Sequence, residues 1–188
     1  MLRYATKQAW IDTVLEDFDS FLIDHAAAEK KASGMAVSML SHYPDKPDIV
    51  LAMADLAIEE MAHFKEVIKL MQARNLVLAP DTKDPYVNAL RKHFRKGSAE
   101  FLLDRLLIGG IVESRGCERF DLIARALPEG KLQRFYRVIA DSEAKHENLF
   151  IDLAGNHFRQ DVIAERLDEL LDLEAAIVET LPNRAALH

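Results

Sequence analysis

The sequence predicts an all-α fold: a four-helix bundle of two antiparallel hairpins joined by a long crossover, with an additional C-terminal helix. Three observations support this prediction. Glycine and proline together make up only 13 of the 188 residues, apolar residues recur every three or four positions over long stretches, and all six prolines lie between those stretches. Because proline cannot continue a helix interior, the prolines mark the joints between helices.

Apolar periodicity and helix-end residues place the individual helices. The expected helices cover about residues 7–41, 47–75, 98–127, 129–154 and 160–180, with room for a short helix at about 87–94 in the connection. Ser98 is a good N-cap residue, and Gly155 is expected to end the fourth long helix. The apolar side of the first helix includes a histidine, in the set Trp10, Val14, Phe18, Phe21, Leu22 and His25.

Length and composition limit the class of protein. A chain of 188 residues predicts a single domain, residues 1–188, and one cysteine excludes an internal disulfide framework. No apolar run is long enough for a membrane span or a signal peptide, so we expect a cytoplasmic protein. The formal net charge of −7 argues against a general nucleic-acid binder but leaves room for a local basic patch.

Two Glu-x-x-His motifs, Glu60 to His63 and Glu143 to His146, are the candidates for a functional site. Residues at i and i+3 leave the same face of a helix, but one such motif alone carries little weight. Glu29 and Glu113 supply partners from the preceding helices, 31 and 30 residues before Glu60 and Glu143. The midpoints of these intervals fall in the two expected turns, so each glutamate faces its motif across an antiparallel hairpin.

The second set of these residues repeats the first at an offset of 83 or 84 residues. Four carboxylates in an apolar interior would repel one another unless positive charge lay among them, and two divalent metal ions would supply it. Mixed carboxylate and imidazole ligation suits iron or manganese. The alternative interpretation is solvated glutamates on charged helix faces, with His63 and His146 packed in the core.

At these motifs the sequence resembles the ferritin-like di-iron carboxylate proteins, and within them the bacterial tRNA 2-methylthio-isopentenyladenosine hydroxylases. The resembling segments are LIDHAAAEKKA, LAIEEMAHFKEVIKLM, IGGIVESRGCERF and DSEAKHENLFIDLA. The resemblance implies an O2-dependent monooxygenase that hydroxylates the isopentenyl group of a hypermodified adenosine beside the tRNA anticodon. It also implies two iron ions held by six ligands, with Glu60 and Glu143 as the bridging pair: Glu29, Glu60, His63, Glu113, Glu143 and His146. Electrons are expected from an external reductase, because no dinucleotide or flavin motif is visible.

Further candidate residues concern the substrate. Gly109, Gly110 and Gly116 lie on the ligand face around Glu113, where missing side chains would open a pocket or, equally, allow close helix packing. Cys117 is expected to point inward as a reduced thiol. Phosphate contacts are expected from the basic run Arg91, Lys92, His93, Arg95 and Lys96. Further arginine candidates are Arg115, Arg119, Arg134 and Arg137. The candidates for base stacking are Tyr86, Phe94 and Tyr136.

Two other functions remain open at the level of sequence. A ferritin-like iron-storage or peroxide-handling protein would use the same six ligands without an organic substrate. A non-enzymatic helical adaptor would bind no stoichiometric metal. The oligomeric state is not indicated by the sequence.

Overall fold

The computed structural model describes residues 2–188, with the side chain of residue 147 left out. Within this range the chain contains helices and no strand, as expected from the low glycine and proline content. The helices are α1 (Gln8–Glu16), α2 (Phe18–His42), α3 (Pro47–Ala73), α4 (Pro85–Arg91), α5 (Ser98–Ala126), α6 (Lys131–His157) and α7 (Gln160–Thr180). None of the described helices is both long and apolar enough to span a bilayer.

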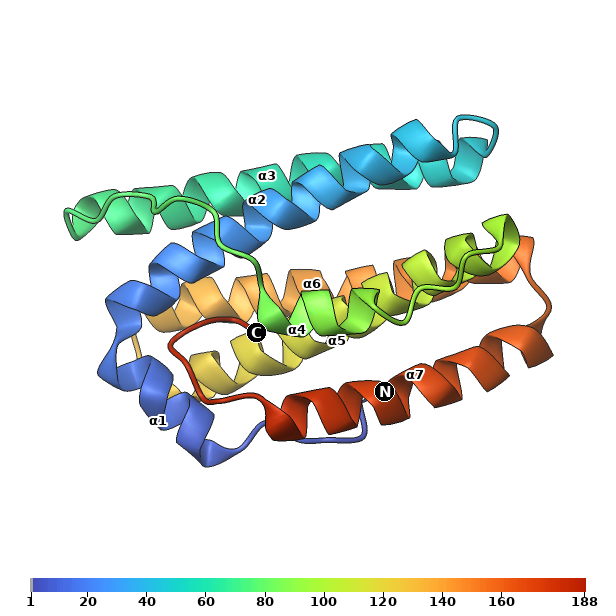
Figure 1. Ribbon diagram of the computed structural model, residues 1–188. Helices are drawn as coiled ribbons and strands as arrows, with labels where there is room; N and C mark the ends of the chain where they lie inside the picture. The colour runs from blue at the N-terminus through green and yellow to red at the C-terminus, as the bar shows by residue number, and fades with distance from the viewer. Residues whose placement is uncertain (1) are drawn as a thin grey trace. The chain divides into compact units, whose positions relative to one another are not determined.

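The chain divides into two compact units. One consists of Asp12–Thr82 and Asn183–Leu187, and in it α2 and α3 pack side by side as a hairpin (Figure 1). The other consists of the chain up to Ile11, Lys83–Pro182 and His188, and in it α5 and α6 form a second hairpin that α7 and α4 pack against. The two predicted hairpins are therefore both present.

The helix boundaries differ from the expected ones at four points. The first long helix is broken at Asp17, whose carboxylate accepts a hydrogen bond from the Ser20 amide and caps α2. The N-cap of α5 is Gly97, not Ser98, and α6 continues past Gly155 to His157. The short helix α4 begins at Pro85, because the Asp84 carboxylate caps it through the amides of residues 86 and 87.

Each hairpin has its own apolar core. In the first, the buried side chains include Phe21, Leu22, Ala26, Ala36, Met39, Ile49, Met53, Leu56, Val67 and Met71. In the second, they include Leu102, Leu103, Leu106, Leu107, Ile111, Phe120, Ile123, Tyr136, Ile139 and Phe150. Apolar side chains recur at helical spacing within each set, so each helix of the two hairpins buries one face.

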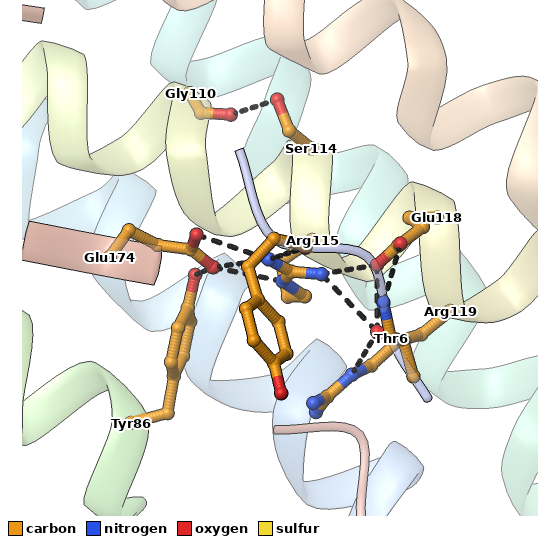
Figure 2. A network of polar contacts seen from close by, with 9 residues as sticks. Thr6, Tyr86, Gly110, Ser114, Arg115, Glu118, Arg119 and Glu174 are labelled. Carbon is orange, nitrogen blue, oxygen red and sulfur yellow. Dashed lines mark hydrogen bonds and ion pairs between the residues drawn. The ribbon is translucent and has the colours of Figure 1, made fainter. Parts of the chain in front are cut away.

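A polar network around the buried Arg115 on α5 joins α5, α7, α4 and the N-terminal segment (Figure 2). Its guanidinium donates to both carboxylate oxygens of Glu174 on α7, at 2.8 and 3.0 Å. Tyr86 on α4 donates to the same carboxylate at 3.1 Å. The remaining guanidinium donors reach Glu118, the hydroxyl of Thr6 and the backbone carbonyl of residue 4. Arg115 thus ties the N-terminal segment to α5 and α7.

The Arg115–Glu174 pair should be a major stabilising contact of this unit. We expect Glu174→Leu to lower the free energy of unfolding by about 3–5 kcal/mol, because the buried Arg115 charge would lose its fully buried counter-ion and keep only the half-buried Glu118. The double variant Arg115→Met/Glu174→Leu should lose less than the sum of the two single losses. Urea denaturation measures both.

The control is Glu169→Ala on the same helix, since Glu169 forms an exposed ion pair with Arg166. Its loss should be below about 1 kcal/mol. Equal losses for Glu174→Leu and Glu169→Ala would show that the buried pair contributes no more than a surface pair.

Candidate metal-binding triads

The first triad consists of Glu29 on α2 with Glu60 and His63 on α3. One ligand atom from each of the three lies within 4.8 Å of the others. The Nδ1 atom of His63 is 3.7 Å from Glu29 Oε2 and 4.0 Å from Glu60 Oε2. Glu29 and Glu60 are buried, with 3% and 1% of their surface exposed. Two carboxylates and an imidazole therefore converge inside one helical hairpin.

A second histidine, His25, contacts this triad from one turn before Glu29. It is fully buried, and its Nε2 atom lies 2.5 Å from Glu29 Oε1. Burial by itself would raise the pKa of Glu29, but contacts with His25, His63 and Glu60 outweigh burial and hold that pKa below its ordinary value. Glu29 is accordingly an ionised carboxylate at neutral pH.

The second triad has the same composition and consists of Glu113 on α5 with Glu143 and His146 on α6. One ligand atom from each lies within 4.8 Å of the others. The Nδ1 atom of His146 is 3.1 Å from Glu143 Oε2 and 3.7 Å from Glu113 Oε2. All three side chains are buried. In both hairpins the same imidazole nitrogen faces both carboxylates.

The electrostatic environment of Glu113 differs from that of Glu29. Burial raises the pKa of Glu113 to about 8, and the neighbouring Glu143 carboxylate adds to this rise, while contact with His146 opposes it. Two buried carboxylates next to each other are costly to ionise together without a cation. The donor set of this triad thus fits a divalent metal ion, which would supply that charge.

The structure distinguishes the glycines that the sequence placed beside Glu113. At Gly109 an added Cβ would lie 2.7 Å from the ring of Phe150 on α6, so close helix packing occupies this position. At Gly116 the nearest atom to such a Cβ is in the Phe120 ring, 4.0 Å away. Gly110 is buried, and its carbonyl accepts a hydrogen bond from Ser114. Cys117 is half-buried, and its thiol donates to the Ala140 carbonyl.

The basic run begins at Arg91, the last residue of α4, and its cations have different surroundings. Arg91, Lys92 and Lys96 are exposed. Arg95 instead donates to the buried carboxylate of Asp104 through its backbone amide and its guanidinium. Arg166 binds the same carboxylate and also the carbonyl of residue 93. Asp104 and Arg166 therefore fix the loop that carries the basic run.

Several expected tRNA contacts are wrong because the side chains are buried. Arg115 is bound to Glu174, and Arg119 packs over the Trp10 ring at 4.7 Å. Burial and the adjacent Arg115 charge lower the pKa of Arg119 to about 10. Tyr86 and Tyr136 are also buried and present no ring to an external base. Arg134 is exposed, Arg137 is paired with Asp121, and Phe94 is half-buried against Phe101.

Sequence reasoning missed two residues that shape these sites. His25 was visible as a polar residue on an apolar helix face, one turn before Glu29, but nothing in the sequence identified its contact. Asp104 was indistinguishable from a surface acid, although it lies among apolar residues of α5. In both cases the partner is set by folding.

A helical hairpin that buries one glutamate opposite a Glu-x-x-His pair, found twice in one chain, is typical of the ferritin-like carboxylate proteins. The chain belongs to the tRNA-(MS[2]IO[6]A)-hydroxylase (MiaE) family, whose model matches residues 1–188. This membership confirms the family and the enzyme class that the sequence predicted.

Two curated relatives are each named tRNA 2-(methylsulfanyl)-N(6)-isopentenyladenosine(37) hydroxylase. The relative from Pseudomonas putida is 33% identical over 183 residues, which cover 97% of this chain and 89% of that protein. The relative from Salmonella typhimurium is 32% identical over 155 residues, which cover 82% of this chain and 56% of that protein.

A solved structure has a similar fold, that of "Protein 43 with aldehyde deformylating oxygenase activity" from Synechococcus. The two share 33% sequence identity with a TM-score of 0.94, over 100% of this chain and 94% of the other. This likeness confirms the predicted all-α, ferritin-like fold class.

The packing at Gly109 gives a prediction with an internal control. Gly109→Ala should lower the free energy of unfolding by about 1–3 kcal/mol, because its methyl group would overlap the Phe150 ring. Gly116→Ala on the same helix should be neutral or stabilising by up to about 1 kcal/mol, because helix propensity improves and the site has space. Thermal and urea unfolding test both. Equal effects of the two substitutions would contradict the assigned packing.

Proposed function

We propose that this protein is an O2-dependent di-iron monooxygenase that hydroxylates the isopentenyl group of a hypermodified adenosine beside the tRNA anticodon. The observation that carries the proposal is the pair of triads with buried carboxylates, identical in donor set, in a chain of this hydroxylase family. The proposal includes a single ferritin-like domain over residues 1–188, which the likeness over the whole chain supports. Acting on tRNA, the protein would work in the cytoplasm.

In this proposal the triads would hold two iron ions, and each triad would supply ligands. Iron accepts mixed carboxylate and imidazole ligation, and each triad supplies two carboxylates and one imidazole. Four carboxylates and two divalent ions bring the formal charge of the ligands and metals together to zero. All four glutamates are buried, and together with this charge balance their burial supports metal binding over the alternative of solvated glutamates on charged helix faces.

The bound iron pair would supply the redox chemistry, namely the reduction of O2 and the removal of an allylic hydrogen from the prenyl group. The chain itself orients the ligands and keeps water away from them. Leu22 and Ala26 near Glu29, and Met53 and Leu56 near Glu60, are buried apolar side chains on the ligand-bearing helices. An external reductase supplies the electrons in this proposal.

Substrate contacts form the remaining part of the proposal. A prenyl pocket beside Gly109, Gly110 and Gly116 stays a prediction, and the Phe150 ring favours close packing at the first of these. For the tRNA backbone we propose the exposed cations Arg91, Lys92 and Lys96. Because Arg95 is bound to Asp104, its role is to hold this loop in place.

Product analysis tests the proposed activity. The apoprotein is loaded anaerobically with Fe(II), mixed with a chemical reductant and tRNA carrying the prenylated base, and exposed to O2. We expect about two iron ions per chain and a hydroxylated nucleoside in the tRNA digest. Oxidation of excess iron without a hydroxylated nucleoside would favour the storage protein, and absence of stoichiometric iron would favour the adaptor.

Ligand variants tie this activity to the triads. His146→Ala and Glu113→Ala should reduce bound iron and product to background while leaving the helical circular dichroism nearly unchanged. Lys145→Ala, an exposed neighbour on α6, should retain both. Full iron retention in either ligand variant would contradict the ligand assignment.

The basic run predicts a salt-dependent contribution to tRNA binding. Lys92→Ala/Lys96→Ala should weaken tRNA binding and reduce the steepness of log affinity against log salt by about 1–2. Each phosphate contact that is lost means that fewer counter-ions are released when tRNA binds. Lys65→Ala/Lys69→Ala on α3 removes the same charge from exposed positions and serves as the control. Filter binding over a range of salt concentrations measures both slopes, and identical slopes would exclude the basic run.

A further inference from the structure

His25 on α2 lies next to the first triad, and the six-ligand assignment gives it no role. It precedes Glu29 by four residues, so its side chain and that of Glu29 leave the same face of the helix. Its Nε2 atom lies 2.5 Å from Glu29 Oε1. The other oxygen, Oε2, faces His63 Nδ1 at 3.7 Å. The two oxygens of Glu29 therefore have different partners.

The surroundings of His25 keep its ring in place. The side chain is fully buried, and the Phe21 ring lies 6.0 Å away between centroids. The adjacent residues Leu22 and Ala26 are buried as well. A donor fixed in this way holds one carboxylate oxygen and directs the other toward the rest of the triad.

The second hairpin has no counterpart at the same position. Four residues before Glu113 the chain has Gly109, which carries no side chain. The space beside Gly109 contains the buried ring of Phe150, 2.7 Å from where a Cβ would stand. An imidazole at this position would overlap that ring. The two triads thus share their donor residues but differ in what surrounds the glutamate.

We infer that His25 is a positioning residue that holds Glu29 Oε1, leaves Oε2 for a metal ion, and makes the two metal positions of the centre unequal. The inference rests on the proposed di-metal function. Glu29 is a ligand of fixed orientation, whereas Glu113, without an imidazole at the corresponding position, can change the way in which its two oxygens bind a metal ion. The α2/α3 position is therefore the one that depends on His25.

Cobalt(II) provides a test that does not require turnover. The full-length apoprotein is titrated with Co²⁺, with the number bound from equilibrium dialysis and the ligand environment from visible absorption and circular dichroism. The wild type should bind two Co²⁺. His25→Leu should weaken one of them by about 10- to 100-fold and change its spectrum, while the other keeps its affinity.

Conservative variants separate positioning from mere packing. His25→Gln places an amide donor at the reach of Nε2 and should restore affinity and spectrum, whereas the shorter His25→Asn should not. These two polar variants decide the question if His25→Leu fails to fold. His42→Leu, at the exposed end of the same helix, is the matched control and should change neither readout.

The outcomes separate this inference from the proposed function. If the wild type binds no Co²⁺, both the proposed metal centre and the positioning role of His25 are rejected. If the wild type binds two Co²⁺ and the His25 variants bind both ions unchanged, or both equally more weakly, the metal centre stands but the inference about His25 is overturned.

Discussion

Burial of carboxylates among apolar side chains is the constraint on which the rest of this structure depends. Each hairpin encloses two glutamates and one histidine, and an ionised carboxylate in such surroundings is costly unless a cation or a hydrogen-bond donor compensates it. The apolar faces of α2, α3, α5 and α6 form the cores, yet they also carry these acids. The helices are thus amphipathic in an unusual sense, with charge on the inward side.

The two triads meet this cost in different ways. Glu29 contacts two histidines, and its pKa lies below the ordinary value. Glu113 has one histidine and a neighbouring carboxylate, and burial raises its pKa to about 8. A repeated sequence pattern has therefore produced two environments, because the residue one turn before the glutamate is His25 in one hairpin and Gly109 in the other.

Elsewhere the second unit compensates buried charge within the protein. Glu174 on α7 is fully buried, and it accepts from Arg115 and Tyr86. Asp104 on α5 is likewise buried and binds Arg95 and Arg166. These acids have arginine partners and hold segments together. The glutamates of the triads instead contact imidazoles and one another. This difference in partners distinguishes the candidate metal ligands from Glu174 and Asp104, which stabilise the fold.

The sequence by itself determined the long helices, apart from their ends and the break at Asp17, and it determined the two hairpins and the composition of both triads. Helical periodicity and the spacing of glutamates about the turns are local properties, and they carry over to the structure at Glu29 and Glu113. Only the tertiary structure decided which polar side chains are buried and what they contact. Arg115 and Tyr86 were surface candidates for tRNA contact, but both are buried, because burial depends on packing between segments distant in the sequence. The sequence placed His25 on an apolar helix face correctly but did not indicate its contact with Glu29.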